Sequence, residues 1–337
     1  MTFKIKRGTN ISHWLSQSEE RGEIRRSRLT KKDVEVLAAA GLDHLRLPVD
    51  EVQMWDDSGA KIAEAWEILD EALGWTLALG MNAVVDLHIL RSHFFNAEHN
   101  PLFSEPKEEE KFAKLWRELS DRLSHYPNDR VAYELMNEPV AKDPADWNRV
   151  ARTAYNAIRS LEKERVIFYG SNLWNSTEQF QFLEVPSGDP NIVLTFHYYN
   201  PMGLTHYRAP WMPEMRAYTG PIQYPGQPIP QAEFDKLAPD LQQKIASRNT
   251  YSSKERMASD LLWPLSLSAR TGLPLYCGEF GAIDFTPDEL RRAWARDFRE
   301  VMEARGIAWA SWDFKFEFGI FTPDHKRTAV GDGLLGN

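Results

Sequence analysis

The segment Val131–Gly170 decides the fold class. It reads VAYELMN at 131–137, DWNRVARTAYNAIRSL at 146–161 and VIFYG at 166–170. The two outer runs are short and apolar, whereas apolar residues recur at helical spacing in the middle run. A strand, a helix and a second strand in this order predict a β–α–β unit with parallel strands.

The same alternation continues along the whole chain and predicts eight strands, several of them continuous apolar runs typical of strands covered on both faces. They are expected near Phe3–Gly8, His44–Pro48, Asn82–His88, Val131–Asn137, Val166–Gly170, Ile192–Tyr198, Leu273–Gly278 and Ala308–Asp313. The predicted helices are Lys31–Ala40, Ala63–Ala78, Glu109–Leu123, Asp146–Leu161, Lys254–Ala269 and Pro287–Ala304.

Eight such units without an internal repeat or a low-complexity linker predict an α/β fold, a (β/α)8 TIM barrel. We expect one catalytic domain over residues 1–337, since barrels of this size fold as one domain. The first predicted strand is not followed by GxGxxG, which disfavours a doubly wound dinucleotide-binding sheet.

Three helix ends carry readable signals. Thr30 precedes a helical run and has Asp33 three residues on, which predicts an N-cap. Thr286 precedes Pro287, and proline is favoured at the first position of a helix. Gly41 follows a predicted helix at the place where glycine commonly ends one.

One connection is unusually long. It runs from Asn200 to about Ser253, leaves the end of the sixth predicted strand, and contains eight prolines between Pro201 and Pro239. Long loops in compact domains are usually functional, and barrel active sites lie at the carboxyl ends of the strands. We expect a wall or lid over a substrate cleft; a dimer contact or a simple insertion remains an alternative.

Composition excludes several classes of function. The chain has 49 acidic and 40 basic residues, a net charge of −9, and no run of five Lys or Arg, so we expect no nucleic-acid partner. The single Cys277 excludes an internal disulfide and a metal site built on a cysteine cluster.

No apolar run approaches the roughly 20 residues that span a bilayer, so no membrane partner is expected. The first ten residues, MTFKIKRGTN, lack the apolar stretch of a secretory signal. The compartment stays open between a cytoplasmic enzyme and a secreted enzyme without its signal.

Two predicted strands end in a glutamate at the expected barrel mouth. YELMNEP at 133–139 places Glu138 after the fourth strand, and LPLYCGEFGA at 273–282 places Glu279 at the end of the seventh. Glycoside cleavage with retention needs such a pair, about 5 Å apart: one carboxyl protonates the leaving oxygen while the other attacks the anomeric carbon.

With its other strand-end motifs, the chain resembles glycoside hydrolase family 5, the cellulase and mannanase family of retaining (β/α)8 glycosidases. The resemblance covers essentially the whole chain. It rests on LRLPVD with Arg46, VVDLHIL with His88, YELMNEP with Asn137 and Glu138, TFHYYNP with His197 and Tyr199, YCGEFG with Glu279, and ASWDF with Trp312.

The resemblance implies that Glu138 is the general acid/base and Glu279 the nucleophile. Glu279 must be ionised to attack, and the resemblance implies that Arg46 and Tyr199 keep Glu279 ionised. Glu138 must begin protonated and later act as a base.

The remaining motif residues are implied to bind the sugar. Asn137 is expected to hydrogen-bond the 2-hydroxyl, His88 and His197 to shape the −1 subsite, and Trp312 to offer an apolar face to the ring. No metal or organic cofactor is needed for any step. Further rim residues that we expect to contact hydroxyls or stack on rings are Asn10, His13, Trp14, Asn172 and Trp174.

Other enzyme classes fit less well. A metal-dependent hydrolase would need an HxH pair after the first strand or an HExxH helix, and neither occurs. Catalysis by the Cys277 thiol lacks an adjacent base, and a buried strand position explains this residue. A barrel that only binds carbohydrate also remains, although both carboxylates argue against it.

The expected substrate is a β-linked oligo- or polysaccharide. HIL at 88–90 and the ELMNEP strand look closest to bacterial cellulase-type members, which predicts an endo-β-1,4-glucanase. An exo-acting β-glycosidase on short oligosaccharides, or a β-mannanase, is the alternative. The long connection after the sixth strand and the missing signal favour exo action.

Overall fold

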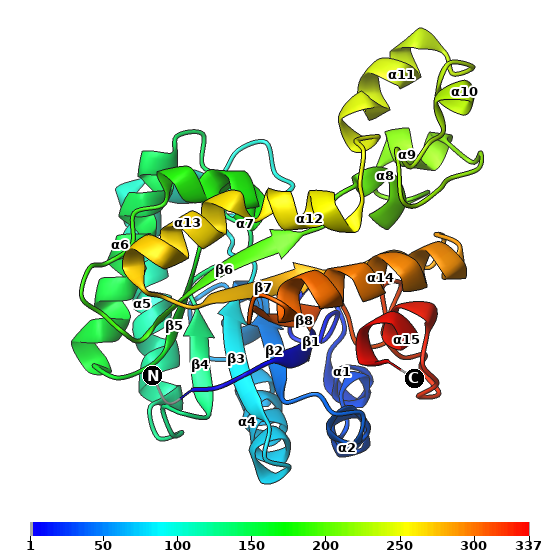
Figure 1. Ribbon diagram of the computed structural model, residues 1–337. Coiled ribbons are helices and arrows are strands. Elements are labelled where there is room, and N and C mark those ends of the chain that lie inside the picture. The colour runs from blue at the N-terminus through cyan, green and yellow to red at the C-terminus, as the bar shows by residue number, and fades with distance from the viewer. Residues whose placement is uncertain (1–2, 337) are drawn as a thin grey trace. The chain divides into compact units, whose positions relative to one another are not determined.

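The structure is a computed structural model that describes residues 3–336. Eight parallel strands close into a barrel in the order of the chain, and helices connect them (Figure 1). The predicted (β/α)8 fold is therefore confirmed. The strands are β1 (Arg7–Asn10), β2 (His44–Val49), β3 (Asn82–Leu87), β4 (Val131–Glu134), β5 (Ile167–Gly170), β6 (Ile192–Tyr198), β7 (Leu275–Phe280) and β8 (Ala308–Ser311).

The chain divides into two compact units, so one domain over 1–337 stays a prediction. Unit 1 comprises the described residues up to His197, Trp263–Gly278 and Ala308–Ala310, and thus nearly the whole barrel. Its helices are α1 (Gly22–Arg28), α2 (Lys31–Ala39), α3 (Glu51–Met54), α4 (Ala63–Ala78), η1 (Pro101–Phe103), α5 (Pro106–Leu123), α6 (Pro144–Leu161), α7 (Asn172–Asn175), η2 (Thr177–Phe182) and most of α13 (Leu262–Thr271).

Unit 2 comprises Tyr198–Leu262, Glu279–Ile307 and the described residues from Ser311 onward. It therefore holds the last residues of β6, β7 and β8 and the long connection after β6. Its helices are α8 (Met202–Thr205), α9 (Pro213–Ala217), α10 (Gln231–Phe234), α11 (Pro239–Ile245), η3 (Ala246–Arg248), α12 (Lys254–Asp260), α14 (Asp288–Glu303) and α15 (Ala329–Leu335).

The interior of the barrel is apolar below its mouth. Its core cluster is contributed by most of the strands and by the residues before them: Phe3, Val84, Ala132, Val166, Phe168, Val193, Tyr276 and Ala310. The first strand begins later than predicted, at Arg7. Phe3 packs edge-on against the Phe168 ring instead of pairing, with 6.0 Å between the ring centroids. Tight packing also explains Gly8, because a Cβ there would lie 2.4 Å from the His44 ring.

Helix boundaries follow the local signals with two corrections. Thr30 and Asp33 form the predicted capping box. Thr286 is not a cap: Pro287 is the N-cap residue, and the Thr286 hydroxyl donates to the carbonyl of Leu204. The predicted helix Lys254–Ala269 is two helices, because Pro264 has no N–H to continue the ladder and its ring would clash one turn back.

The connection after β6 is folded rather than a plain loop. Its short helices α8 to α11, the yellow-green cluster of Figure 1, enclose their own apolar cluster of Tyr207, Met215, Tyr218, Ile229 and Ile245. The Asn249 side chain adds two hydrogen bonds to the backbone of Ile229. Its role as a wall or lid stays a prediction.

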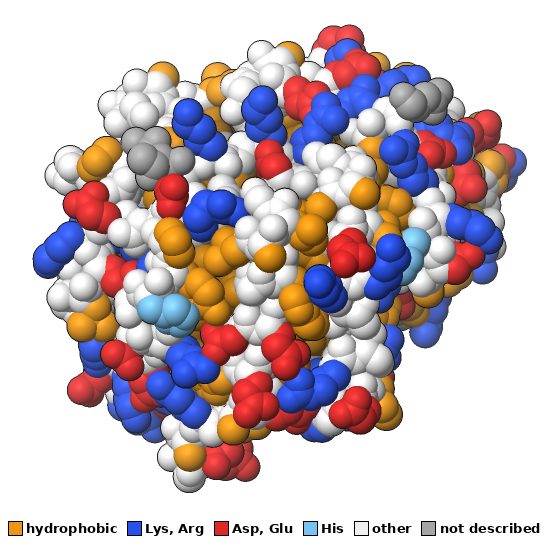
Figure 2. Space-filling view, turned by 90° about the horizontal axis from the view of Figure 1, so that it is seen from below, with side chains coloured by type: hydrophobic (Ala, Val, Ile, Leu, Met, Phe, Trp, Pro, Cys, Tyr) orange, Lys and Arg blue, Asp and Glu red, His pale blue; other side chains and the backbone are white. Residues whose placement is uncertain are grey.

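The surface shown in Figure 2 has no single sign of charge. Acidic and basic side chains are interspersed there, with a strip of apolar side chains between them. Across residues 3–336, no helix combines the length and apolarity that a membrane span requires.

Candidate active site

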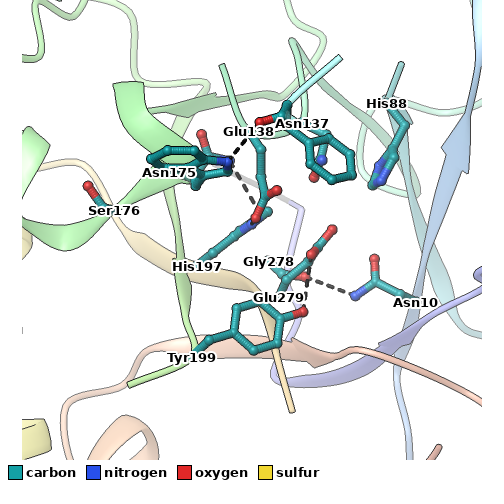
Figure 3. A network of polar contacts seen from close by, with 12 residues as sticks. Asn10, His88, Asn137, Glu138, Asn175, Ser176, His197, Tyr199, Gly278 and Glu279 are labelled. Atoms are coloured by element: carbon teal, nitrogen blue, oxygen red, sulfur yellow. Dashed lines mark hydrogen bonds and ion pairs between the residues drawn. The ribbon is translucent and has the colours of Figure 1, made fainter. Parts of the chain in front are cut away.

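Glu138 lies just past the end of β4 and is nearly buried, with 9% of the residue exposed. Its backbone is left-handed, at φ 46°, a conformation that costs roughly 1–2 kcal/mol for a residue with a side chain. Such strain is commonly stored at functional sites. The His197 ring lies beside the carboxyl, with Nδ1 2.9 Å from Oε1 (Figure 3).

Arg46 on β2 organises the base of the site. Its guanidinium makes a bidentate ion pair with Glu134 and approaches Asp86 at 3.0 Å, and all three side chains are fully buried. It also donates to the side-chain oxygens of Asn10 and Asn137, at 2.8 and 3.0 Å. Asn137 is thereby oriented with its Nδ2 buried and without a partner among the described residues.

Register explains this grouping. Asn10 and Arg46 are partners across β1 and β2, and Asp86 and Glu134 are partners across β3 and β4. Burial raises the pKa of both carboxyls, while the charge of Arg46 works against that rise. One guanidinium thus supports two carboxyls and two amides at the barrel mouth.

His88 is held from both sides. Nδ1 lies 2.6 Å from Asp86 Oδ2, and Nε2 lies 3.1 Å from the amide nitrogen of Gln17. The Gln17 backbone N–H in turn donates to Asp50 at 2.7 Å. Burial raises the pKa of Asp50 to about 7, although the hydrogen bond from the Gln17 N–H acts in the opposite direction.

After β5, Trp174 is half exposed, at 49%, and its indole N–H donates to the carbonyl of Phe95 at 3.0 Å. The exposed face of the ring is therefore fixed in direction. The next residue, Asn175, is fully buried, and its Nδ2 lies 3.4 Å from His197 Nε2 (Figure 3).

Glu279 follows Gly278 directly on β7 and belongs to unit 2. The hydroxyl of Tyr199 donates to Glu279 Oε2 at 3.3 Å (Figure 3). His206 packs edge-on against the Tyr199 ring at 5.1 Å, and burial lowers the pKa of His206 to about 3. A neutral imidazole thus supports the tyrosine whose hydroxyl faces Glu279.

Trp312, one residue past β8, also belongs to unit 2. It packs with Ala209, Ile283 and Phe318, and its backbone N–H donates to the carbonyl of Phe280. Gly281 permits this close approach, because a Cβ there would lie 2.2 Å from the Trp312 carbonyl oxygen. The indole is 8% exposed.

The sequence pattern described as Cellulase (glycosyl hydrolase family 5) matches residues 8–317. The chain belongs to this family. The predicted resemblance is confirmed, and this family 5 protein is a glycoside hydrolase with a cellulase-like sequence.

Named relatives agree over nearly the full length. Endoglucanase C of Acetivibrio thermocellus is 32% identical over 332 residues, which cover 96% of this chain and 95% of the relative. Cellodextrinase A of Ruminococcus flavefaciens is 27% identical over 309 residues, covering 90% and 84%. Endoglucanase Cel5A of Thermotoga maritima has the same fold, with a TM-score of 0.78, 24% identity, and 98% and 96% of the two chains covered.

Among the secondary rim residues of this family 5 hydrolase, two have surroundings that differ from an open rim position. Trp14 is 1% exposed, which leaves no indole face open for stacking. The Asn172 amide both donates to and accepts from the backbone of Ala141, so it fastens two loops. Asn10 bonds Arg46 and the Gly278 carbonyl, and His13 is half-buried. Sugar contacts by these residues stay predictions.

Sequence reasoning missed several members of the site. They include Asp86 and Glu134. Asp86 could have been found, because it lies two residues before His88 and therefore points to the same side of the chain at the end of β3. Gln17 and Asn175 could not. Each has a left-handed backbone in an irregular loop, with φ 52° and 51°, and no apolar period marks such positions.

Proposed function

We propose that this family 5 hydrolase is an endo-acting β-1,4-glucanase that cleaves with retention of configuration. Glu138 acts as general acid/base and Glu279 as nucleophile. The observation that carries the proposal is that each glutamate lies at or just past the carboxyl end of a barrel strand beside its own hydrogen-bonding partner, His197 for Glu138 and Tyr199 for Glu279.

In the first step, Glu279 attacks the anomeric carbon and forms a glycosyl ester while Glu138 gives its proton to the leaving glycosidic oxygen. In the second step, Glu138 removes a proton from water, which attacks the same carbon and releases Glu279. The Tyr199 hydroxyl supports the ionised form of Glu279, since a donor stabilises a carboxylate.

Binding of the sugar falls to the residues around the two carboxyls. Asn137 accepts from Arg46 through Oδ1, so its buried Nδ2 is the group left to donate to the 2-hydroxyl. Trp174 offers a half-exposed indole of fixed direction, suited to stacking on a pyranose ring. His88 is held in place by Asp86 and Gln17 for a hydroxyl contact.

The substrate assignment follows the relatives. The one at 32% identity over nearly its whole length is named Endoglucanase C, which favours internal cleavage of a β-1,4-glucan. A second candidate is exo action on short oligosaccharides, favoured by the folded insertion after β6 and by the relative named Cellodextrinase A.

The test is a time course of products from cello-, manno- and laminari-oligosaccharides, read by chromatography, with Glu279→Gln as the blank. The proposal expects internal cuts in the cello series. Products released only from chain ends support the exo-acting alternative. Binding of oligosaccharides without any release of reducing sugar over days contradicts both and favours a binding protein.

A further inference from the structure

The single turn α7 (Asn172–Asn175), which follows β5, is not an ordinary right-handed helix. Leu173, Trp174 and Asn175 all have left-handed backbones, with φ of 47°, 61° and 51°. Each such residue costs roughly 1–2 kcal/mol, and asparagine tolerates the conformation best. The turn is held in place by the backbone N–H of Trp174, which donates to the Pro139 carbonyl, and by the two hydrogen bonds between Asn172 and Ala141.

This turn places the side chain of Asn175 in a tightly packed, buried position. The side chain is fully buried, and a Cβ on Gly170 would lie 2.6 Å from Asn175 Oδ1. Glycine at 170 therefore makes the room for the amide. Nδ2 lies 3.4 Å from His197 Nε2, whereas Oδ1 has no hydrogen-bond partner among the described residues.

His197 connects Asn175 to the acid/base residue. Burial, with further contributions from Arg46 and His88, lowers the pKa of His197 well below its ordinary value, so the ring is neutral and carries one proton. An amide N–H at Nε2 requires a bare nitrogen there. The proton then belongs on Nδ1, which lies 2.9 Å from Glu138 Oε1.

We propose that Asn175 is a positioning residue that selects the Nδ1–H tautomer of His197 and so aims that N–H at Glu138. This rests on the proposed role of Glu138 as acid/base. The donor favours the ionised carboxylate, the form that must remove a proton from water in the second step. Asn175 thus acts on catalysis only through His197 and touches no substrate.

Other charged groups also act on this pair. Arg46 on β2 and His88, one residue past β3, act on His197, and Arg46 also forms ion pairs with Asp86 and Glu134. From β7, Gly278 approaches the ring, since a Cβ there would lie 3.4 Å from His197 Nε2, and Glu279 is the next residue. The Asn175 variants leave these groups unchanged.

The first test reads the tautomer directly. Protein labelled with ¹⁵N-histidine is examined by long-range proton–nitrogen NMR, and the His197 signals are assigned by their loss in His197→Gln. We expect a protonated Nδ1 and a bare Nε2 in the wild type. Asn175→Gly should move part of the proton to Nε2, while Ser176→Ala, the matched loop control, should not. A wild-type proton on Nε2 overturns the proposal.

The second test reads the consequence. Asn175→Gly keeps the left-handed turn available, so it should fold. For a substrate with a poor leaving group, the alkaline limb of the pH profile of kcat/KM reports the pKa of the general acid. Its midpoint should move to higher pH by up to about one unit, because the carboxylate of Glu138 loses about one hydrogen bond. A uniform loss at every pH, with the limb unmoved, indicates a merely structural role and contradicts the proposal.

A separate variant, Glu138→Ala, tests the proposed function independently of the tautomer. If Glu138→Ala kept wild-type kcat/KM on the same substrate, Glu138 would not be the acid/base. The NMR result would still report whether Asn175 selects the tautomer.

Discussion

Arg46 donates to both oxygens of the Glu134 carboxylate, with Nε 2.7 Å from Oε2 and Nη2 3.0 Å from Oε1. Neither side chain is exposed to solvent. Only a planar guanidinium can make this bidentate contact and also donate to Asn10 and Asn137. The stability of the barrel mouth and the orientation of Asn137 therefore depend on the same residue.

We expect Arg46→Lys to lower the free energy of unfolding by about 3–5 kcal/mol, because a lysine leaves buried carboxyls and amides without donors. Urea unfolding followed by tryptophan fluorescence measures this loss. The matched control is Arg26→Lys, whose partners Glu67 and Glu71 are largely exposed, with an expected loss below about 1 kcal/mol. Equal losses in the two variants would argue against a supporting role for Arg46.

Tyr199→Phe removes the hydroxyl that faces Glu279. We expect kcat/KM to fall roughly 10- to 100-fold, as for loss of a hydrogen bond to a charged group. Tyr207→Phe is the control, because that hydroxyl donates to the Gly220 carbonyl within the insertion. Steady-state kinetics on cello-oligosaccharides compare the two variants. A wild-type kcat/KM for Tyr199→Phe would show that the Tyr199 hydroxyl does not contribute to catalysis.

Trp174→Ala should raise KM for cello-oligosaccharides about tenfold while leaving kcat within a few-fold, since stacking of a sugar on an indole contributes binding. Trp263→Ala on α13 is the matched control, because its indole is similarly exposed, at 41% against 49%. If both variants behave alike, Trp174 is an ordinary surface aromatic and not a sugar platform.

Asp50 makes stability depend on pH. Burial raises the pKa of its carboxyl to about 7, whereas in the unfolded chain this pKa is about 4. Between these values the folded state keeps a proton that the unfolded state has lost, so this contribution to stability falls as pH rises from about 4 to about 7. Above pH 7 the cost of the buried charge is fully present.

The melting temperature of Asp50→Asn, compared with that of the wild type at the same pH, should therefore be more favourable at pH 8 than at pH 5. The exposed Asp121→Asn serves as the control and should show no such change between the two pH values. Thermal unfolding by circular dichroism measures both. A difference between wild type and Asp50→Asn that is the same at pH 5 and pH 8 would mean that Asp50 ionises normally.

Strand-end motifs could be predicted from the sequence because two physical constraints coincide there. A continuous apolar run predicts a buried strand, and a polar residue at its end must lie at the barrel mouth, as found for Glu138 and Glu279. Trp14 shows the limit. It follows the first strand like a rim residue, yet it packs inside, and no local pattern distinguishes the two.

The insertion after β6 shows a second limit. Its prolines and short helices carry no long period, so the sequence reads as a loop, although Tyr207, Met215 and Ile245 build a separate apolar cluster. Asn175 is a third case. Its importance comes from a left-handed backbone and from the space left by Gly170, and both depend on tertiary structure.

The proposed attack of Glu279 on the anomeric carbon can be trapped chemically. A 2-deoxy-2-fluoro-cellobioside with a good leaving group slows release of the glycosyl ester, so mass spectrometry of the digested protein can locate the attached sugar. We expect one sugar on the peptide that contains Glu279 and none in Glu279→Gln. A sugar on another residue, or cellobiose products of inverted configuration without any covalent adduct, would contradict it.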